Sequence, residues 1–203
     1  IDAIFLNLCW GESASYQSNV LPMNPDIKIS GDALETCLAA CRKYGVQLHA
    51  WKVTWRTWQQ KGMASPLVQA LQKQGRLQVD FEGAARPWLC PSNARNQDEQ
   101  VAAMLELADK GVDGVHFDYI RYNDVNGCFC DGCRAKFERK IGHKAESWPF
   151  CTREEWKKEW NAFRCEQIDI TVQRTHKEVH QAHPQCVVSA AVFPDWPATK
   201  VTI

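Results

Sequence analysis

The segment DGVHFDYIRY, residues 113–122, places ionisable and aromatic side chains in what otherwise resembles a buried strand. In a β-strand, residues i and i+2 lie on the same face. His116 and Asp118 therefore share one face, and Val115, Phe117 and Tyr119 share the other. We expect the large apolar face to pack against helices. His116 and Asp118 would then lie on the opposite face, near the carboxyl end of the strand.

Strands and helices are predicted to alternate along the chain. Apolar runs of strand length occupy residues 3–8, 46–53 and 186–193, in addition to 113–122. Helical periodicity is found at residues 31–45, 98–111 and about 154–182; in the first of these, Leu34, Cys37, Leu38 and Cys41 recur at helical spacing before Gly45. Because parallel neighbours need long crossover connections, this alternation predicts βαβ units and a parallel sheet.

Two parallel α/β folds fit the alternation, the open doubly wound sheet and the (β/α)8 barrel. The doubly wound fold usually carries a glycine-rich phosphate loop after its first strand, but LCWGESAS (8–15) has no such motif. The (β/α)8 (TIM) barrel is therefore favoured. A full barrel takes about 250 residues and eight strands. We expect residues 1–203 to form a single partial barrel domain, with a Cys-rich loop insertion at about 123–152.

Composition limits the possible partners. The 203 residues include 24 basic and 24 acidic side chains, so the formal net charge is zero. This balance gives no basic surface for a nucleic acid, and no apolar run approaches the roughly 20 residues of a membrane span. The first residues already have the pattern of a strand, with no signal peptide, which indicates a cut before them. We expect a carbohydrate partner and an exported protein, periplasmic or extracellular.

Several other side chains are expected on the same face as Asp118 or at its rim. Strand alternation places Asn7, His49, Trp51 and Ser189 opposite the apolar positions of their own strands. Tyr119, Arg121 and Tyr122 flank Asp118 and suit contact with hydroxyl groups. Indole rings at or beyond strand ends are suited to stacking on sugar rings; these are Trp10, Trp51, Trp55, Trp88 and Trp196.

The segment GVDGVHFDYIRY followed by CFCDGCRAKFE, with LHAWKVTWR upstream and RPWLCPSN between, resembles the glycoside-hydrolase-like family 10 group of (β/α)8 barrels. The resemblance covers nearly the whole chain and assigns it barrel strands 2 to 5. It implies a carbohydrate-active enzyme. Family members commonly have Pro after IRY, where this chain has Asn123.

Glycosidic bond cleavage needs two carboxyl groups, one to protonate the leaving oxygen and one to attack the sugar or activate water. Asp118 is the nucleophile candidate, by analogy with barrel glycosidases whose nucleophile ends the fourth strand. Asp195, just past the strand at 186–193, is the preferred second carboxylate. Glu12, Asp80 and Glu82 are loop residues that could also reach this face. Asn7, Trp10, His49, Trp51, His116 and Trp196 are expected to bind substrate with Tyr119, Arg121 and Tyr122, and catalysis is expected to need no cofactor.

Eight of the ten cysteines form two groups in the sequence. Cys9, Cys37, Cys41 and Cys186 lie in or beside predicted strands and on a helix, and are expected to be thiols packed as small hydrophobic groups. CFCDGC supplies Cys128, Cys130 and Cys133, with Cys151 farther on. A structural zinc site, a pair of disulfides and free thiols are all open alternatives for these four.

Two other functions fit the same residues. His49, His116 and Asp118 would be the ligands of a metal-dependent barrel hydrolase of the deacetylase or amidohydrolase type, although H-x-D alone is a weak metal motif. A non-catalytic glycan-binding barrel is the second alternative, because a fold does not determine a function.

Overall fold

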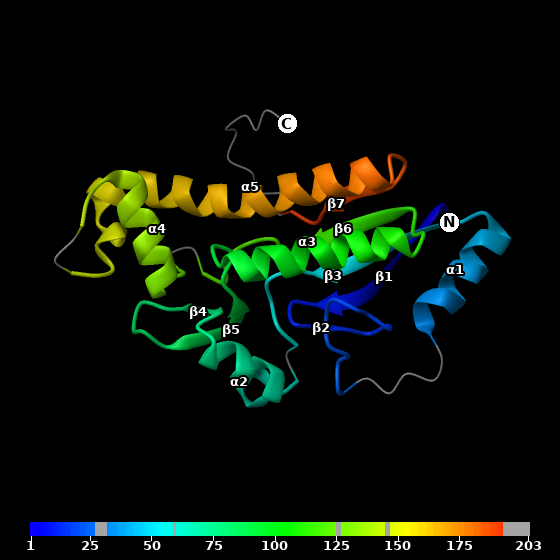
Figure 1. Ribbon diagram of the computed structural model, residues 1–203, viewed down its shortest axis with the longest axis horizontal. Helices are drawn as coiled ribbons and strands as arrows, with labels where there is room; N and C mark the ends of the chain where they lie inside the picture. Colours follow the sequence, from blue (N-terminus) through cyan, green and yellow to red (C-terminus); the bar gives the residue numbers. More distant parts are fainter. Residues whose placement is uncertain (27–31, 59, 125–126, 145–146, 193–203) are drawn as a thin grey trace.

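The computed structural model describes residues 1–26, 32–58, 60–124, 127–144 and 147–192. Strands and helices alternate along the chain (Figure 1). In chain order the elements are β1 (Ala3–Trp10), β2 (Ser13–Ala14), α1 (Ala33–Tyr44), β3 (Gln47–Val53), α2 (Pro66–Lys73), β4 (Leu77–Val79), β5 (Ala85–Leu89), α3 (Ala94–Asp109), β6 (Gly114–Asp118), α4 (Asp131–Ile141), α5 (Lys157–Ala182) and β7 (Val187–Ala190), with single 3-10 turns at Gly62–Ala64, Phe150–Thr152 and Glu154–Trp156.

Five strands form one sheet with the order β2-β1-β3-β6-β7. β1, β3, β6 and β7 are parallel, and each pairs with the next of these strands along the chain. The short β2 runs antiparallel to β1. Asn7, Trp51, His116 and Ser189 are cross-strand partners in a single row. The parallel sheet and the shared face of these four residues are as predicted from the alternation.

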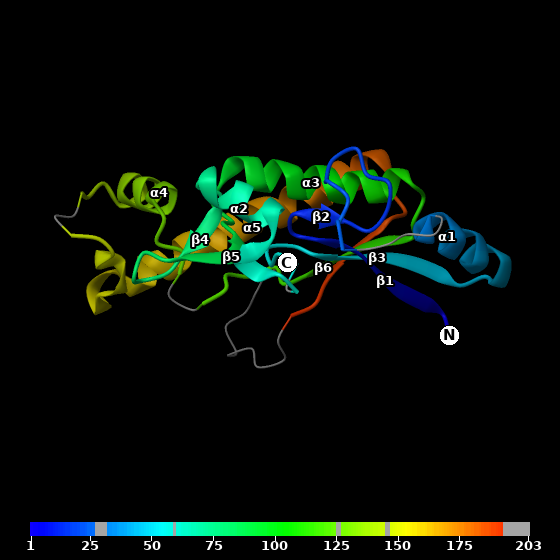
Figure 2. The ribbon, with the colours of Figure 1, turned by 90° about the horizontal axis from the view of Figure 1, so that it is seen from below.

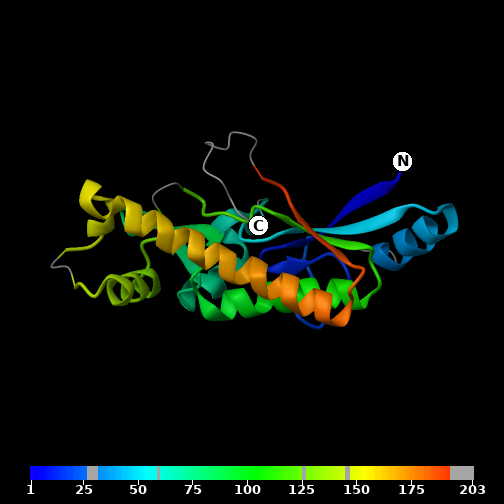
Figure 3. The ribbon, with the colours of Figure 1, turned by 90° about the horizontal axis from the view of Figure 1, so that it is seen from above.

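The opposite face of the sheet is covered by three helices. Leu48 and Phe117 pack in one core with Leu34 of α1, Met104 of α3 and Val179 of α5. Figures 2 and 3 show α3 and α5 lying together along one side of the strands. A doubly wound sheet reverses its strand order and carries helices on both faces. Sequential strand order with helices on one face is instead typical of consecutive βα units of a barrel.

Helix α1 lies within the predicted segment 31–45 and ends at the predicted cap, Gly45. The Asp32 side chain accepts hydrogen bonds from the backbone N–H groups of Leu34 and Glu35, which is a standard N-cap. Gly45 follows the last turn with φ 66°, in the left-handed region that glycine adopts without steric cost. Leu34, Leu38 and Cys41 are buried, so the predicted apolar stripe is the packed face.

Helix α5 spans 26 residues and lies beside α3. Gln97 Nε2 of α3 donates to the carbonyl oxygen of Gln167 at 3.4 Å, and Arg174 forms an ion pair with Asp98 at 2.7 Å. Residues 154–156, expected as its first turn, form a separate 3-10 turn. Within the described ranges, no helix has both the length and the apolar character that crossing a bilayer requires.

Five elements were not predicted, namely β2, α2, β4, β5 and α4. The antiparallel hairpin β4–β5 and the helix α2 pack around Trp55, Val68 and Leu89 in a separate core. The segment at 123–152, expected as a Cys-rich loop, contains α4. Phe137 of this helix packs against Phe163 and other aromatic side chains in a third core.

A substitution at Gly114 tests whether this residue and His49 lie on the same face of the sheet. A methyl group at Gly114 would lie 2.6 Å from Cε1 of His49, its cross-strand partner, and closer still to Nδ1. We therefore expect Gly114→Ala to lower the free energy of unfolding by about 1–3 kcal/mol, the usual cost of overpacking. Chemical denaturation measures this loss. A double variant with His49→Ala removes the clash, so its loss of unfolding free energy should be smaller than the sum of the losses of the two single variants. Equal stability of Gly114→Ala and wild type would contradict the packing.

Candidate active site

Asp118 is the last residue of β6, at the carboxyl end of the parallel strands. Its side chain is half-buried and lies on the face opposite the helices. Oδ2 accepts a hydrogen bond from the indole Nε1 of Trp51 at 3.0 Å, and Oδ1 accepts one from the backbone N–H of Tyr119 at 2.7 Å. None of the ion pairs found among the described residues involves Asp118. The carboxylate is thus oriented by neutral donors and keeps access to solvent.

Tyr119 ends the strand earlier than the sequence predicts. Its φ of 49° is in the left-handed region, which is unusual for a bulky residue and ends the extended backbone of β6. The expectation that Tyr119 shares the helix-facing side with Val115 and Phe117 is therefore wrong. Its ring packs against Trp88 at 5.5 Å instead.

Two guanidinium groups surround the Tyr119 ring. Arg56 Nη1 donates to the Tyr119 hydroxyl at 2.6 Å, and its Cζ lies 4.8 Å from the ring centroid. Arg121 lies 4.7 Å from the same centroid and 5.4 Å from that of Trp88. These contacts place positive charge and aromatic surface just beyond the end of β6. Such groups suit a ligand rich in hydroxyl groups.

His116 lies one step below Asp118 on the same face. Its Nδ1 is 2.9 Å from the hydroxyl of Ser189, and its ring contacts the Phe5 ring edge-on at 4.9 Å. Burial lowers the pKa of His116, and the neighbouring His49 lowers it further, while Asp118 opposes the shift. His116 is therefore predominantly neutral at pH 7.

This shift makes stability depend on pH. Because the folded pKa is lowered, the unfolded chain binds more protons once the pH falls below about 6.5, the ordinary histidine value. The contribution of His116 to folding stability is full above that pH and is lost as the pH falls. We expect wild type to lose more unfolding free energy between about pH 7.5 and about pH 5.5 than His116→Gln, measured by denaturant titration. Equal losses would contradict the burial of a neutral ring.

His49 lies below His116 on the neighbouring strand. Its ring stacks obliquely on Phe5 at 4.8 Å, and Nε2 is 3.3 Å from the side-chain oxygen of Gln47. The predicted strip of Asn7, His49, Trp51 and His116 is thus assembled on one face, with Asp118 at its carboxyl end.

The carboxylate Glu12 belongs to the other side of the sheet. It accepts hydrogen bonds from the backbone N–H of Trp58 at 3.0 and 3.1 Å and borders a cavity of about 240 Å³ that also contacts Arg76 and Glu99. Burial raises the pKa of Glu12, and Lys52 opposes this shift. Because this cavity is lined by residues of α2 and α3, including Leu71 and Glu99, Glu12 lies on the helix side of the sheet and not across from Asp118. The expectation that it reaches the same face is wrong.

Lys52 is fully buried on this helix-facing side. Its Nζ donates to the carbonyl oxygen of Trp10 at 3.2 Å, and burial lowers its pKa, with Cys9, Glu12 and Glu99 opposing the shift. The Trp10 ring makes an edge contact with Trp58 at 4.9 Å.

The other predicted carboxylates and rings are distributed as follows. Asp80 is paired with Arg86 at 2.6 Å in the β4–β5 hairpin, where Glu82 also lies. Trp55 is fully buried, which removes it as a stacking surface. Asp195 and Trp196 lie outside the described residues.

Tyr122 is directed away from Asp118. It is buried in the third core, where the Arg164 guanidinium lies 4.6 Å from its ring centroid. It only borders a hollow of about 620 Å³ that is also lined by Arg121, Asn123 and Asn161. Burial raises its pKa well above the ordinary tyrosine value. Tyr122 is therefore a packing residue, contrary to the expected substrate contact.

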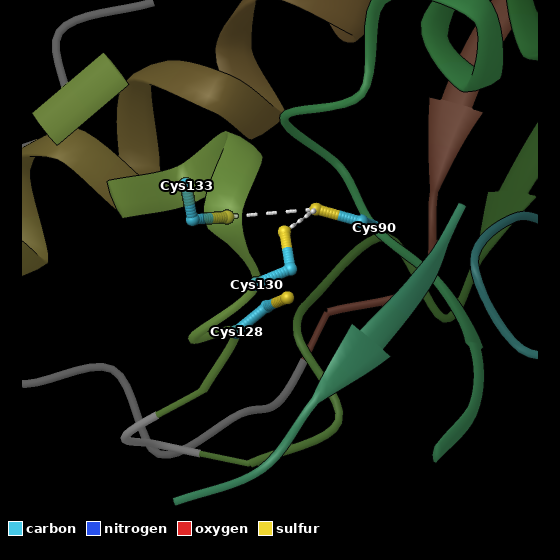
Figure 4. A group of neighbouring side chains, drawn as sticks. All are labelled: Cys90, Cys128, Cys130 and Cys133. Carbon is cyan, nitrogen blue, oxygen red and sulfur yellow. Dashed lines mark hydrogen bonds between the residues drawn. The ribbon is translucent and has the colours of Figure 1, made fainter. Parts of the chain in front are cut away.

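Four cysteines come together, but they are not the four predicted from the sequence. The sulfur atoms of Cys90, Cys128, Cys130 and Cys133 all lie within 4.8 Å of one another (Figure 4). Cys151 is outside this group, and burial raises the pKa of its thiol to about 12. Cys90 follows β5, about 40 residues before the CFCDGC motif, so only the fold brings it there. Cys9, Cys41 and Cys186 are buried and Cys37 is half-buried, all as free thiols.

The residues that sequence reasoning missed are Arg56, Trp58 and Cys90. The first two follow β3 in a loop without regular structure. Cys90 carried a detectable signal, because three thiolates of a C-x-C-x-x-C motif need a fourth to complete a tetrahedral site.

The chain has a mixed α/β fold whose parallel strands follow one another in sequence order, and solved structures share this fold. The chain is similar to α-L-fucosidase isoenzyme 2 from Paenibacillus thiaminolyticus, with a TM-score of 0.63 and 14% identity over 94% of this chain and 27% of the fucosidase. It is also similar to a hypothetical protein from Ruminiclostridium thermocellum ATCC 27405 (TM-score 0.54, 17% identity, 94% of this chain and 83% of the other) and to the α-galactosidase from Thermus thermophilus (TM-score 0.51, 10% identity, 93% and 31%).

This chain spans less than a third of each of these two glycosidases. No family model and no curated protein matches the sequence. At these identities the similarity concerns the fold, and it does not select the family 10-like group.

Proposed function

We propose that this chain is part of a (β/α)8 barrel glycoside hydrolase in which Asp118 is a catalytic carboxylate. The observation that carries the proposal is the position of Asp118: a half-exposed carboxylate at the carboxyl end of a parallel strand, oriented by Trp51 and the Tyr119 backbone. Active sites of (β/α)8 barrels lie at this end of the strands. The similar structures with named activities include an α-L-fucosidase and an α-galactosidase.

The apolar residues of the site face support a closed barrel. Phe5 and Val187 lie on the face opposite the helices and are 47% and 45% exposed. Large apolar side chains in such a position would be covered if further strands closed the sheet into a barrel, whose interior is packed with side chains. The four sequential parallel strands would then be one section of it, assigned by resemblance to strands 2 to 5.

The proposed chemistry uses two carboxyl groups. Asp118 acts as nucleophile, because its negative charge faces the open side of the sheet and its two hydrogen-bond donors hold it in one orientation. Asp195 is proposed as the acid/base partner, from its place in the sequence a few residues after Ala191, whose backbone N–H bonds to Phe117. Trp51, Tyr119 and Arg121 would bind the sugar. No cofactor takes part in this scheme.

The metal-dependent hydrolase has less support. Among the described residues, the only cluster of three or more potential metal ligands is the group of four cysteines. His49, His116 and Asp118 share a face without converging, and His116 Nδ1 is occupied by Ser189. These three side chains would have to rearrange to hold an ion.

The test of the proposal is turnover. We expect the protein to release aryl alcohol from at least one member of a panel of chromogenic α- and β-glycosides, with activity that survives treatment with a chelator too weak to strip thiolate-bound zinc. Glycan binding without hydrolysis of any substrate would instead indicate a binding module. Activity that requires an added divalent ion would favour the metal-dependent hydrolase.

A further inference from the structure

We propose that Cys90, Cys128, Cys130 and Cys133 bind one Zn²⁺ ion that joins the segment after β5 to the segment after β6. In Figure 4 the four sulfur atoms point toward a common centre from these two parts of the chain. Cys90 comes directly after β5, and the other three lie just before and within the first turn of α4.

The spacing of the sulfurs fits a single ion. Thiolates about 2.3 Å from a tetrahedral zinc ion are separated from one another by about 3.8 Å. The sulfur of Cys90 lies 3.5 Å from that of Cys133 and 3.8 Å from that of Cys130. In an iron–sulfur cluster the four thiolates bind different iron atoms. The four sulfurs are then spread over a larger distance than the 4.8 Å within which they all lie here.

The arrangement also differs from two disulfides. A disulfide joins two sulfurs at about 2.05 Å and leaves each without a further sulfur partner. Here Cys90 is at contact distance from two different cysteines at once, and all ten cysteines are free thiols. Four sulfurs that share a centre are the arrangement that a tetrahedral ion needs.

Hydrogen-bond donors around the sulfurs would support negatively charged thiolates. The backbone N–H of Val79 donates to the Cys128 sulfur at 3.2 Å, and the Ser92 hydroxyl lies 3.0 Å from the Cys133 sulfur and 3.3 Å from that of Cys90. Such outer contacts are typical of metal sites, where they orient the ligands and spread their charge. These donors come from the β4–β5 hairpin and the loop after it. The residues around the cysteines are therefore suited to the site, in addition to the four ligands.

Four protein ligands make the proposed site structural. Cys90, Cys128 and Cys133 are fully buried and Cys130 is half-buried, so no position remains open for water or substrate. The ion would hold the loop that leaves Asp118, including Arg121, against the loop that follows Trp88.

Metal content and ligand identity test the proposal. We expect the purified reduced protein to contain about one zinc per chain, and cobalt(II) substitution to give the visible bands of tetrahedral tetrathiolate coordination. Cys90→Ser should lose most of the bound metal, whereas Cys151→Ser, an equally buried thiol, should keep it. Zinc retained by Cys90→Ser, or no metal bound when zinc is supplied, would overturn the assignment.

A second measurement on wild type covers the case in which Cys90→Ser fails to fold. Alkylation followed by peptide mass spectrometry should label the exposed Cys165 at once, and the four proposed ligands only after a strong chelator has removed the metal. Detection of disulfides among the four, or labelling of all four before any chelator is added, would contradict zinc binding.

Discussion

Asp118→Asn is expected to lower kcat/KM for any glycoside that the protein hydrolyses by at least about 10³-fold. The amide has nearly the same shape and can still accept a hydrogen bond from Trp51 Nε1 or from the Tyr119 backbone. It carries no negative charge, so it can neither attack the anomeric carbon nor stabilise the positive charge that develops there. Initial rates on the best substrate of the panel measure the loss.

The control for this variant is Asp98→Asn. Asp98 is an exposed carboxylate of α3 that pairs with Arg174 of α5, on the helix side of the sheet. Its loss should leave kcat/KM within about twofold, because surface ion pairs contribute little to stability. Full activity of Asp118→Asn would refute the catalytic role. If wild type shows no turnover and Asp118→Asn binds glycan as tightly as wild type, the site binds glycan without hydrolysing it.

The strand that carries this aspartate was predictable up to its last residue. Alternation in 113–118 placed Val115 and Phe117 against the helices and His116 and Asp118 on the other face, because side chains of a strand alternate whatever the tertiary context. The prediction failed at Tyr119. Tyr119 has a positive φ and contacts Arg56 and Trp88, which belong to other segments of the chain. The alternation of residues along a strand does not reveal such contacts.

The contrast between local patterns and contacts across the fold also explains what was predicted correctly for α1 and wrongly for the cysteines. The glycine cap of a helix is a local signal, so the end of α1 at Gly45 was predicted correctly. The fourth cysteine was assigned to Cys151 because it is near the CFCDGC motif in the sequence. The fold places Cys90 there instead, since β5 ends beside the start of α4. Proximity along the chain is a poor guide to a site assembled from two loops.

Removal of the proposed zinc is expected to unfold the third core while the parallel sheet stays folded. Structural zinc sites with thiolate ligands contribute about 10–16 kcal/mol of apparent binding free energy at pH 7, comparable to the entire stability of a typical domain. Cys90, Cys128 and Cys133 are members of this core, with Phe137 and Trp160 packed around them. The sheet has its own core against α1 and α3, which contains none of these cysteines.

Hydrogen exchange read by peptide mass spectrometry separates the two regions. After chelation, amides of α4 (131–141) should exchange at least about tenfold faster, whereas those of β3 and β6 should keep most of their protection, since local regions open independently when their cores are separate. Adding zinc back should restore the original pattern. Chelation that leaves α4 protected would mean that the aromatic packing around Phe137 and Trp160 holds this region without a metal. Loss of protection in β3 and β6 as well would show that both cores unfold as one unit, and the metal would then stabilise the whole sheet that presents Asp118.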